Sequence, residues 1–116
     1  MRQARRSVCP VACTLDIIGD KWTLLVVRDL ALGKSQFKEF MASPERIATN
    51  ILTDRLGRLL EHGLVERRQS PEHEGREVYV LTGKGESLIP LLRSIALWGL
   101  EHIKGTEARL APGGAV

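Results

Sequence analysis

The chain has 116 residues, of which 43% are hydrophobic and 27% are charged, and its formal net charge is +3. This profile is typical of one soluble globular domain that buries its own core. Arg28, Asp29 and Arg93 interrupt the longest apolar runs well before the about 18 residues that cross a membrane, and the N-terminus lacks the apolar stretch of a signal peptide. We therefore expect a cytoplasmic protein with no membrane partner.

The distribution of the arginines is more informative than the net charge, because many basic proteins bind no polyanion. The arginines occur in three places: at the N-terminus, on a predicted central helix and around a predicted hairpin. These arginines are Arg2, Arg5 and Arg6; Arg55 and Arg58; and Arg67, Arg68 and Arg76. We interpret them as parts of a nucleic-acid-binding surface, with ordinary solvated charge as the alternative. Residues 1–8 are predicted to be a flexible basic arm before a single domain at 9–103.

Three helices are predicted after this arm. Pro10 begins the first, since its missing N–H costs nothing at a helix start, and Gly19 ends it. Residues 21–33 predict a second helix, so rich in apolar side chains that we expect burial on most sides. A third, short helix is predicted at 35–43, with Ser35 as its N-cap.

The most informative element is a helix predicted over residues 48–62 and ended by Gly63. Four leucines recur on one side at 100° per residue and predict its core face: Leu52, Leu56, Leu59 and Leu60. The opposite face carries Asn50, Asp54, Gly57, Arg58 and Glu61, with Thr49 and Thr53 on its flank. Short hydroxyl and amide side chains near a helix start are suited to contacts with bases and phosphates.

Two strands are predicted at 64–69 and 77–81, and the segment between them has the composition of a hairpin turn. The order helix, strand, turn, strand is typical of a winged helix, in which the helix enters the DNA major groove and the hairpin reaches a neighbouring groove. We therefore predict a mainly α fold with a small β-hairpin wing (α+β), a winged helix-turn-helix. The predicted function is sequence-specific binding of double-stranded DNA.

Thr82 is predicted to cap one long last helix that reaches residue 103 and is kinked at Pro90, and residues 104–116 are predicted to be a disordered tail. The helix has more apolar side chains than a lone domain needs, which favours a homodimer with a twofold axis and a palindromic DNA site. The alternative is that it only covers its own core. The predicted interface residues are Val11, Leu15, Leu91, Ile95, Trp98 and His102.

Several motifs occur in the order typical of one family of regulators. They are CPV at 9–11, IIGDKWTLLVVRDL at 17–30, FKEF at 37–40, ILTDRL at 51–56, LEHGLVER at 60–67 and REVYVLTGKG at 76–85. Over residues 9–103 the chain resembles the HxlR family of winged-helix transcriptional regulators, which is related to the MarR-type proteins. The resemblance implies a homodimeric repressor or activator that binds an inverted repeat in promoter DNA.

The resemblance also implies how DNA is bound. It places the helix around residues 49–58 in the major groove and the wing around Arg76 at the minor groove or the backbone. Ala48 and Gly57 depart from the family, which often has a serine cap and a long polar residue at these positions. The predicted DNA-binding residues are Lys34, Ser35, Gln36, Thr49, Asn50, Thr53, Asp54, Arg55, Arg58, Arg67 and Arg76.

Cys9 occupies the position of an N-terminal cysteine that responds to oxidants, quinones or aldehydes in many HxlR-type proteins. It also precedes Pro10 at a predicted helix start, where the helix dipole and nearby arginines favour a reactive thiol. Two interpretations stay open. Either Cys9 senses an oxidant or a small electrophile, by modification or by a disulfide with a partner subunit, or it is an ordinary, partly buried thiol. Cys13 is expected in the core.

Other functional classes find little support in the sequence. The histidines are scattered, and neither a phosphate-binding glycine loop nor a nucleophile motif occurs, so we expect no enzymatic activity and no cofactor. A metal site at Cys9 and Cys13 would lack a second close pair of ligands, so no metal is expected. A winged-helix protein-interaction module that does not bind DNA specifically is the alternative function.

Overall fold

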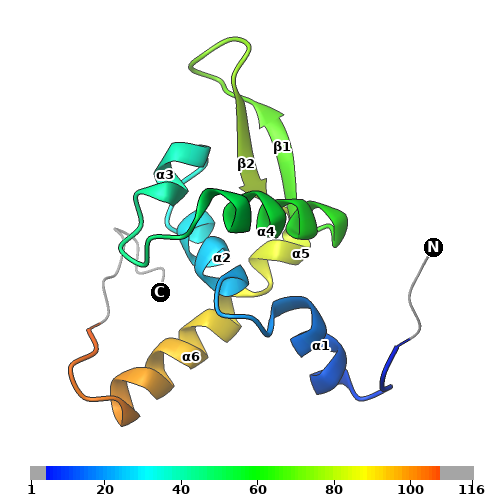
Figure 1. Ribbon diagram of the computed structural model, residues 1–116, viewed down its shortest axis with the longest axis vertical. Coiled ribbons are helices and arrows are strands. Elements are labelled where there is room, and N and C mark those ends of the chain that lie inside the picture. The colour runs from blue at the N-terminus through cyan, green and yellow to red at the C-terminus, as the bar shows by residue number, and fades with distance from the viewer. Residues whose placement is uncertain (1–4, 108–116) are drawn as a thin grey trace.

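The computed structural model describes residues 5–107, which form six helices and a two-stranded antiparallel sheet (Figure 1). The elements are α1 (Pro10–Ile18), α2 (Thr23–Ala31), α3 (Phe37–Met41), α4 (Thr49–Glu61), β1 (Val65–Gln69), β2 (Glu77–Leu81), α5 (Gly83–Glu86) and α6 (Ile89–His102). The predicted mainly helical fold with a hairpin wing is confirmed. Parts of the predicted arm and tail, residues 1–4 and 108–116, lie outside the described residues.

The core is built around α4. Leu52, Leu56 and Leu59 on one side of this helix are at most 2% exposed, and they belong to one buried cluster with Val27 of α2 and Phe40 of α3. Burying a leucine side chain stabilises a fold by about 1.5 to 3 kcal/mol, so these three residues fix the rotation of α4 about its own axis. The predicted core face of α4 is confirmed.

The wing is a regular hairpin in which β1 pairs with β2 from Val65–Leu81 to Gln69–Glu77. It projects away from the helices, while α1 and α6 lie on the opposite side of the domain (Figure 1). The loop between the strands includes Gly75 with a φ of 81°, a left-handed conformation that glycine adopts without a steric cost. Tyr79 ties β2 to the helices, because its ring meets the edge of Phe40 with centroids 6.3 Å apart.

The start of α3 differs by one residue from the prediction. The helix begins at Phe37, and its N-cap is Gln36 rather than Ser35. The Glu39 carboxylate accepts hydrogen bonds from the backbone N–H groups of Ser35 and Gln36, at 3.0 and 2.9 Å. The Ser35 carbonyl accepts the Tyr79 N–H at 2.8 Å. Ser35 therefore joins α3 to the wing instead of capping the helix.

The predicted single last helix is wrong, because the structure has two helices, α5 and α6. Thr82 caps α5 as expected, with its hydroxyl accepting the Gly85 N–H at 3.1 Å. The regular α-helical hydrogen bonding is interrupted at Leu88, whose N–H donates to the Gly85 carbonyl three residues earlier, and Pro90 lies in the first turn of α6. Proline lacks the N–H needed inside a helix, whereas the first turn needs no such donor. None of the helices within residues 5–107 has the length and apolar character to cross a membrane.

Candidate nucleic-acid interface

The polar face of α4 points away from the core. Thr49, Asn50, Thr53 and Asp54 are all exposed, and the same holds for Gly57 further along the helix. Their exposure follows from the burial of the leucines, since residues on opposite faces of a helix cannot both contact the core. The predicted outward orientation of the hydroxyl and amide groups is confirmed.

The start of α4 carries no side-chain cap. Its N-cap is Ala48, and no side chain within the described part of the chain bonds to the first-turn amides there. Thr53 donates its hydroxyl to the Thr49 carbonyl at 2.9 Å, which keeps this side chain close to the helix. Unsatisfied N–H groups and the helix dipole favour an anion such as a phosphate at a helix start. The first-turn N–H groups of α4 are therefore open to solvent or to a bound anion.

Arg55 lies on the flank of α4 that faces α2. Its Nε donates to the Asp20 carboxylate at 2.8 Å, and its side chain also pairs with Asp54. Only 19% of the Arg55 side chain is exposed. Its guanidinium therefore joins α4 to the segment before α2, a role that sequence reasoning missed because the two residues are 35 positions apart.

Asp20 organises the start of α2. Its carboxylate accepts the N–H groups of Trp22 and Thr23, at 3.0 and 3.2 Å, and also the Thr23 hydroxyl. Burial by itself raises the pKa of Asp20, but the hydrogen bonds from Thr23, Arg55 and Trp22 and the positive charge of Arg55 outweigh it. The pKa of this carboxyl is therefore held well below its ordinary value.

Arg58 also lies on a flank of α4 and not on its outward face. Its guanidinium donates to the carbonyls of Asp16 and Ile17 at the end of α1, at 3.3 and 3.5 Å. Cations are favourable at the C-terminal end of a helix, where carbonyl groups lack partners. The placement of Arg58 with Asn50 on one face was wrong, because the contact that attracts it comes from α1, 42 residues earlier.

Asp29, an acidic residue of α2, organises the turn between α3 and α4. Asp29 is 4% exposed, and its carboxylate accepts the hydroxyl of Ser43 at 2.5 Å. Lys34 donates to that hydroxyl at 2.6 Å and lies 3.9 Å from Asp29. Arg28 bonds to Asp29 and to Glu45 in the turn. The signal in the sequence was an aspartate among apolar residues on the buried face of a helix.

The remaining predicted DNA-binding residues lie at the wing and at α3. Arg67 on β1 and Arg76 before β2 are exposed, whereas Ser35 and Gln36 are half-buried at the start of α3. Arg68, the next residue after Arg67 on β1, pairs with Glu66. The wing thus offers the guanidinium groups of Arg67 and Arg76 to a partner.

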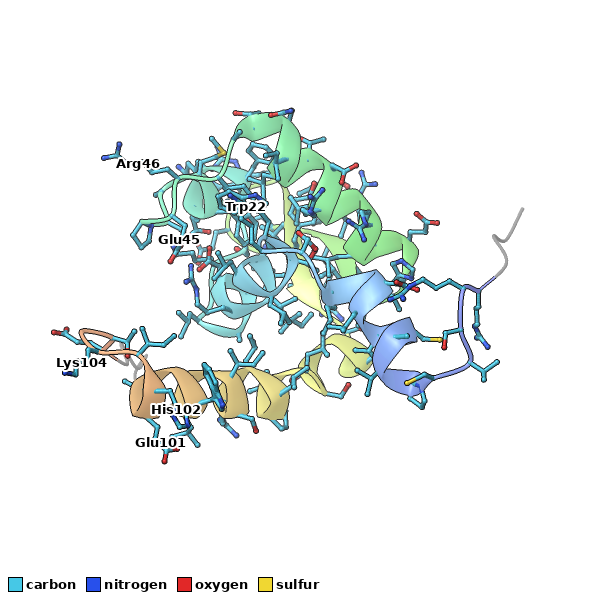
Figure 2. All side chains as sticks on the ribbon, turned by 60° about the horizontal axis from the view of Figure 1, so that its bottom comes forward. Trp22, Glu45, Arg46, Glu101, His102 and Lys104 are labelled. Atoms are coloured by element: carbon cyan, nitrogen blue, oxygen red, sulfur yellow. The ribbon has the colours of Figure 1, made fainter. Side chains whose placement is uncertain are left out.

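The predicted dimer residues form an apolar surface on the other side of the domain. Val11, Leu15, Leu91, Ile95 and Trp98 are between 38% and 66% exposed. A groove of about 380 Å³ lies between α1 and α6 and is lined by four of these residues together with Pro10, Thr14, Ile18 and Leu24. His102 lies on the outside of α6 (Figure 2), with its ring centroid 4.8 Å from that of Trp98.

Both cysteines are free thiols at the start of α1. Cys9 is exposed and is the N-cap residue of the helix. Cys13 is half-buried, and its Sγ donates to the Ser7 carbonyl at 3.3 Å, so its predicted place in the core was wrong. The Arg6 guanidinium donates to the Asp16 carboxylate at 2.8 Å, so its hydrogen bond is with Asp16 and not with the Cys9 thiol. Between residues 5 and 107, no three His, Cys, Asp or Glu side chains are grouped closely enough to hold a metal ion.

Comparison with known proteins agrees with this geometry. Residues 17–107 match the sequence model of the family described as HxlR-like helix-turn-helix. A relative from Methanothermobacter thermautotrophicus, named an uncharacterized HTH-type transcriptional regulator, is 38% identical over 92 residues, which are 79% of this chain and 70% of the relative.

Solved structures have the same fold. The protein PA1607 has a TM-score of 0.81 at 41% identity, over 90% of this chain and 75% of that chain. The redox regulator HypR in its oxidized form has a TM-score of 0.71 at 33% identity, over 81% of this chain and 97% of that chain.

The ion pair between Asp20 and Arg55 leads to a prediction about stability. We expect Asp20→Asn to lower the free energy of unfolding by about 1 to 2 kcal/mol near pH 6, because the helix start loses its carboxylate acceptor. The pKa of Asp20 is lowered in the folded state, so its contribution is complete above the unfolded-state pKa of about 4 and declines as pH falls below it. The difference between variant and wild type should therefore shrink below about pH 4.

Urea unfolding at a series of pH values measures this difference. Asp54→Asn is the matched control, because Asp54 also pairs with Arg55 but is 57% exposed, and we expect little effect from it. A loss for Asp20→Asn that is equally large at pH 3 and pH 6 would contradict the assigned role of the carboxylate.

Proposed function

Since the chain belongs to the HxlR-like helix-turn-helix family and is a winged-helix transcriptional regulator, we propose that it acts as a homodimer on an inverted repeat in promoter DNA. The observation that carries this proposal is the exposed polar face of α4, held outward by the buried leucines. We place its action in the cytoplasm, at the nucleoid of a prokaryote. Promoter DNA, a second copy of the chain and an oxidant or electrophile are the proposed partners.

In the proposed complex, the first half of α4 lies in the major groove. Asn50 supplies an amide that can form two hydrogen bonds with an adenine edge, and Thr49 and Thr53 supply hydroxyls. Arg67 and Arg76 contact the backbone from the wing, which projects beside α4 (Figure 1). Arg55 and Arg58 position α4 through their contacts with Asp20 and the end of α1. Lys34 likewise supports the turn through Ser43.

The apolar side of the domain supports the proposed dimer. Exposed apolar side chains on α1 and α6 flank a groove of about 380 Å³, which a second copy can fill. Trp98 and the neighbouring ring of His102 extend this surface along α6. A twofold axis through these helices would direct two copies of α4 and the wing toward successive turns of a duplex.

Cys9 is the proposed site of signal reception. It is exposed at the start of α1, directly before Pro10 and two residues before Val11, both of which line the groove. A modification or an intersubunit disulfide at this position would change how the two subunits pack. The similarity to HypR, a redox regulator, supports an oxidant as the signal.

The alternative function is a protein-interaction module that does not bind DNA specifically. The two proposals differ in their dependence on salt, because DNA binding through several phosphate contacts weakens steeply as salt rises and an apolar protein interface does not. Selection of bound duplexes from a random pool would supply the operator for all the experiments below.

We expect Asn50→Ala to weaken operator binding by about tenfold or more and to relax the preference for one base, since a bidentate base contact contributes about 1 to 3 kcal/mol. Arg76→Ala should weaken binding to all sequences and lower the slope of log affinity against log salt by about 1. Fluorescence anisotropy with labelled duplexes measures both effects. Arg93→Ala on exposed α6 is the control, and variants that bind like wild type would refute this docking.

Trp98→Glu should convert the dimer to a monomer without unfolding it, because Trp98 is 61% exposed in the single chain. Loss of a central tryptophan raises a dissociation constant by about thirtyfold or more. Sedimentation velocity gives the mass in solution. Gln69→Glu adds the same charge on the exposed wing and should remain dimeric. An unchanged mass for Trp98→Glu would remove α6 from the interface.

Treatment of the wild type with diamide or a quinone should change operator affinity by about tenfold, within the usual range of coupling between two sites. We expect Cys9→Ser to abolish the response and Cys13→Ser to keep it, because Cys9 is exposed and Cys13 is half-buried. Anisotropy and intact-protein mass would be recorded on the same samples. A Cys9→Ser protein that responds like wild type would remove Cys9 from the mechanism.

A further inference from the structure

Arg46 has an unusual backbone conformation. Its φ is 58°, and it is the only residue other than glycine between residues 5 and 107 with a positive φ. A side chain in this left-handed region meets the following carbonyl, so arginine is disfavoured there relative to glycine. A glycine would remove this strain, which means that the turn itself gains nothing from the arginine side chain.

The surroundings of Arg46 hold it in place on both sides. Its N–H donates to the carbonyl of Ser43 at 3.1 Å, and Ser43 is itself bound to buried Asp29. On the other side, Ile47 is 7% exposed and belongs to the core. Glu45 is held by two hydrogen bonds from Arg28, at 2.8 and 2.9 Å. These contacts hold the backbone of the turn on both sides of Arg46.

The Arg46 side chain projects outward from the segment that leads into α4, away from the body of the domain (Figure 2). Within the described range, no ion pair or side-chain hydrogen bond engages it. The neighbouring carboxylate of Glu45 is already neutralised by Arg28. Arg46 is thus an uncompensated positive charge two residues before Ala48, the N-cap residue of α4.

Most other basic residues around α2, α3 and α4 have partners in the protein, although the exposed side chain of Lys38 in α3 has no ion pair or hydrogen bond among the described residues. Arg55 bonds to Asp20, Arg58 to the end of α1, Arg28 to Glu45, and Lys34 to Ser43. Asp54 on the outward face of α4 adds negative charge. Attraction to DNA at this end of the helix needs a cation that is not already engaged, and Arg46 fits this requirement.

We propose that Arg46 is a phosphate-binding residue of the DNA interface, presented by the strained turn before α4. This inference rests on the proposed function of α4 in the major groove. A guanidinium binds a phosphate through two parallel hydrogen bonds and keeps its charge at any physiological pH. The contact is to the backbone and independent of base sequence. The strain at Arg46 is then the cost of placing a cation at this point.

Three substitutions separate strain from charge. Arg46→Gly removes both, so its melting temperature should equal or exceed that of the wild type while its DNA affinity falls about tenfold. Arg46→Ala removes the charge and keeps the strained backbone, so it should lose the same affinity without the gain in stability. Arg46→Lys keeps the charge and should retain most of the affinity.

The readout is the salt dependence of binding to the selected operator and to a mixed-sequence duplex of about 30 base pairs, enough for two half-sites. Arg46→Gly should lower the slope of log affinity against log salt by about 0.9 on both duplexes, and Arg93→Ala should leave it unchanged. Wild-type affinity and slope in Arg46→Gly would overturn the proposal. A loss of affinity with an unchanged slope would also overturn it, because the role would then be conformational.

Failure of the proposed function gives a different result. If the wild type selects no duplex and binds DNA without steep salt dependence, the regulator would not use α4 as proposed, whatever Arg46 does. If the wild type binds with a steep slope, and Arg46→Gly and Arg46→Ala have the same affinity and slope as the wild type, then the inference about Arg46 is wrong but the proposed function stands.

Discussion

The packing of the α4 leucines against α2 is the constraint on which the rest of the structure depends. Leu52, Leu56 and Leu59 are almost fully buried, and rotation of the helix by even one residue would expose two or more of them. The outward direction of Asn50 is therefore a consequence of core packing. In this fold the stability of the domain and the geometry of its proposed DNA surface come from the same helix.

Helix α2 supports this arrangement from both ends. At its start Asp20 binds Arg55, and near its end Asp29 binds Ser43 in the turn before α4. Asp29 is almost fully buried and Asp20 is half-buried, and each carboxylate accepts several hydrogen bonds, so each favours one arrangement of the groups around it. The two acids fix both the rotation of α4 and the turn that leads into it. Most basic groups near α4 are used in this way, and few remain for a partner.

The domain has two functional sides. The wing and the polar face of α4 are distant from the apolar groove between α1 and α6 (Figure 1). In the proposed function, Cys9 lies at the groove side, so a signal there would reach DNA through the packing of the two subunits and not through a contact with the DNA surface. Such coupling needs two arrangements of the subunits with different affinities for the operator.

The sequence by itself determined the local elements and their faces. The leucine period predicted the core face of α4 and Gly63 its end, Pro10 and Gly19 bounded α1, and the turn composition predicted the wing. All of these depend on residues within a few positions of one another. Only the tertiary structure decided the partners of the arginines. Arg55 and Arg58 bond to groups 35 and 42 residues away, and periodicity holds no information about contacts at that distance. The left-handed conformation of Arg46 was also decided only by the tertiary structure. The hydrogen bonds and the buried neighbour that hold it depend on how α2 packs against the turn.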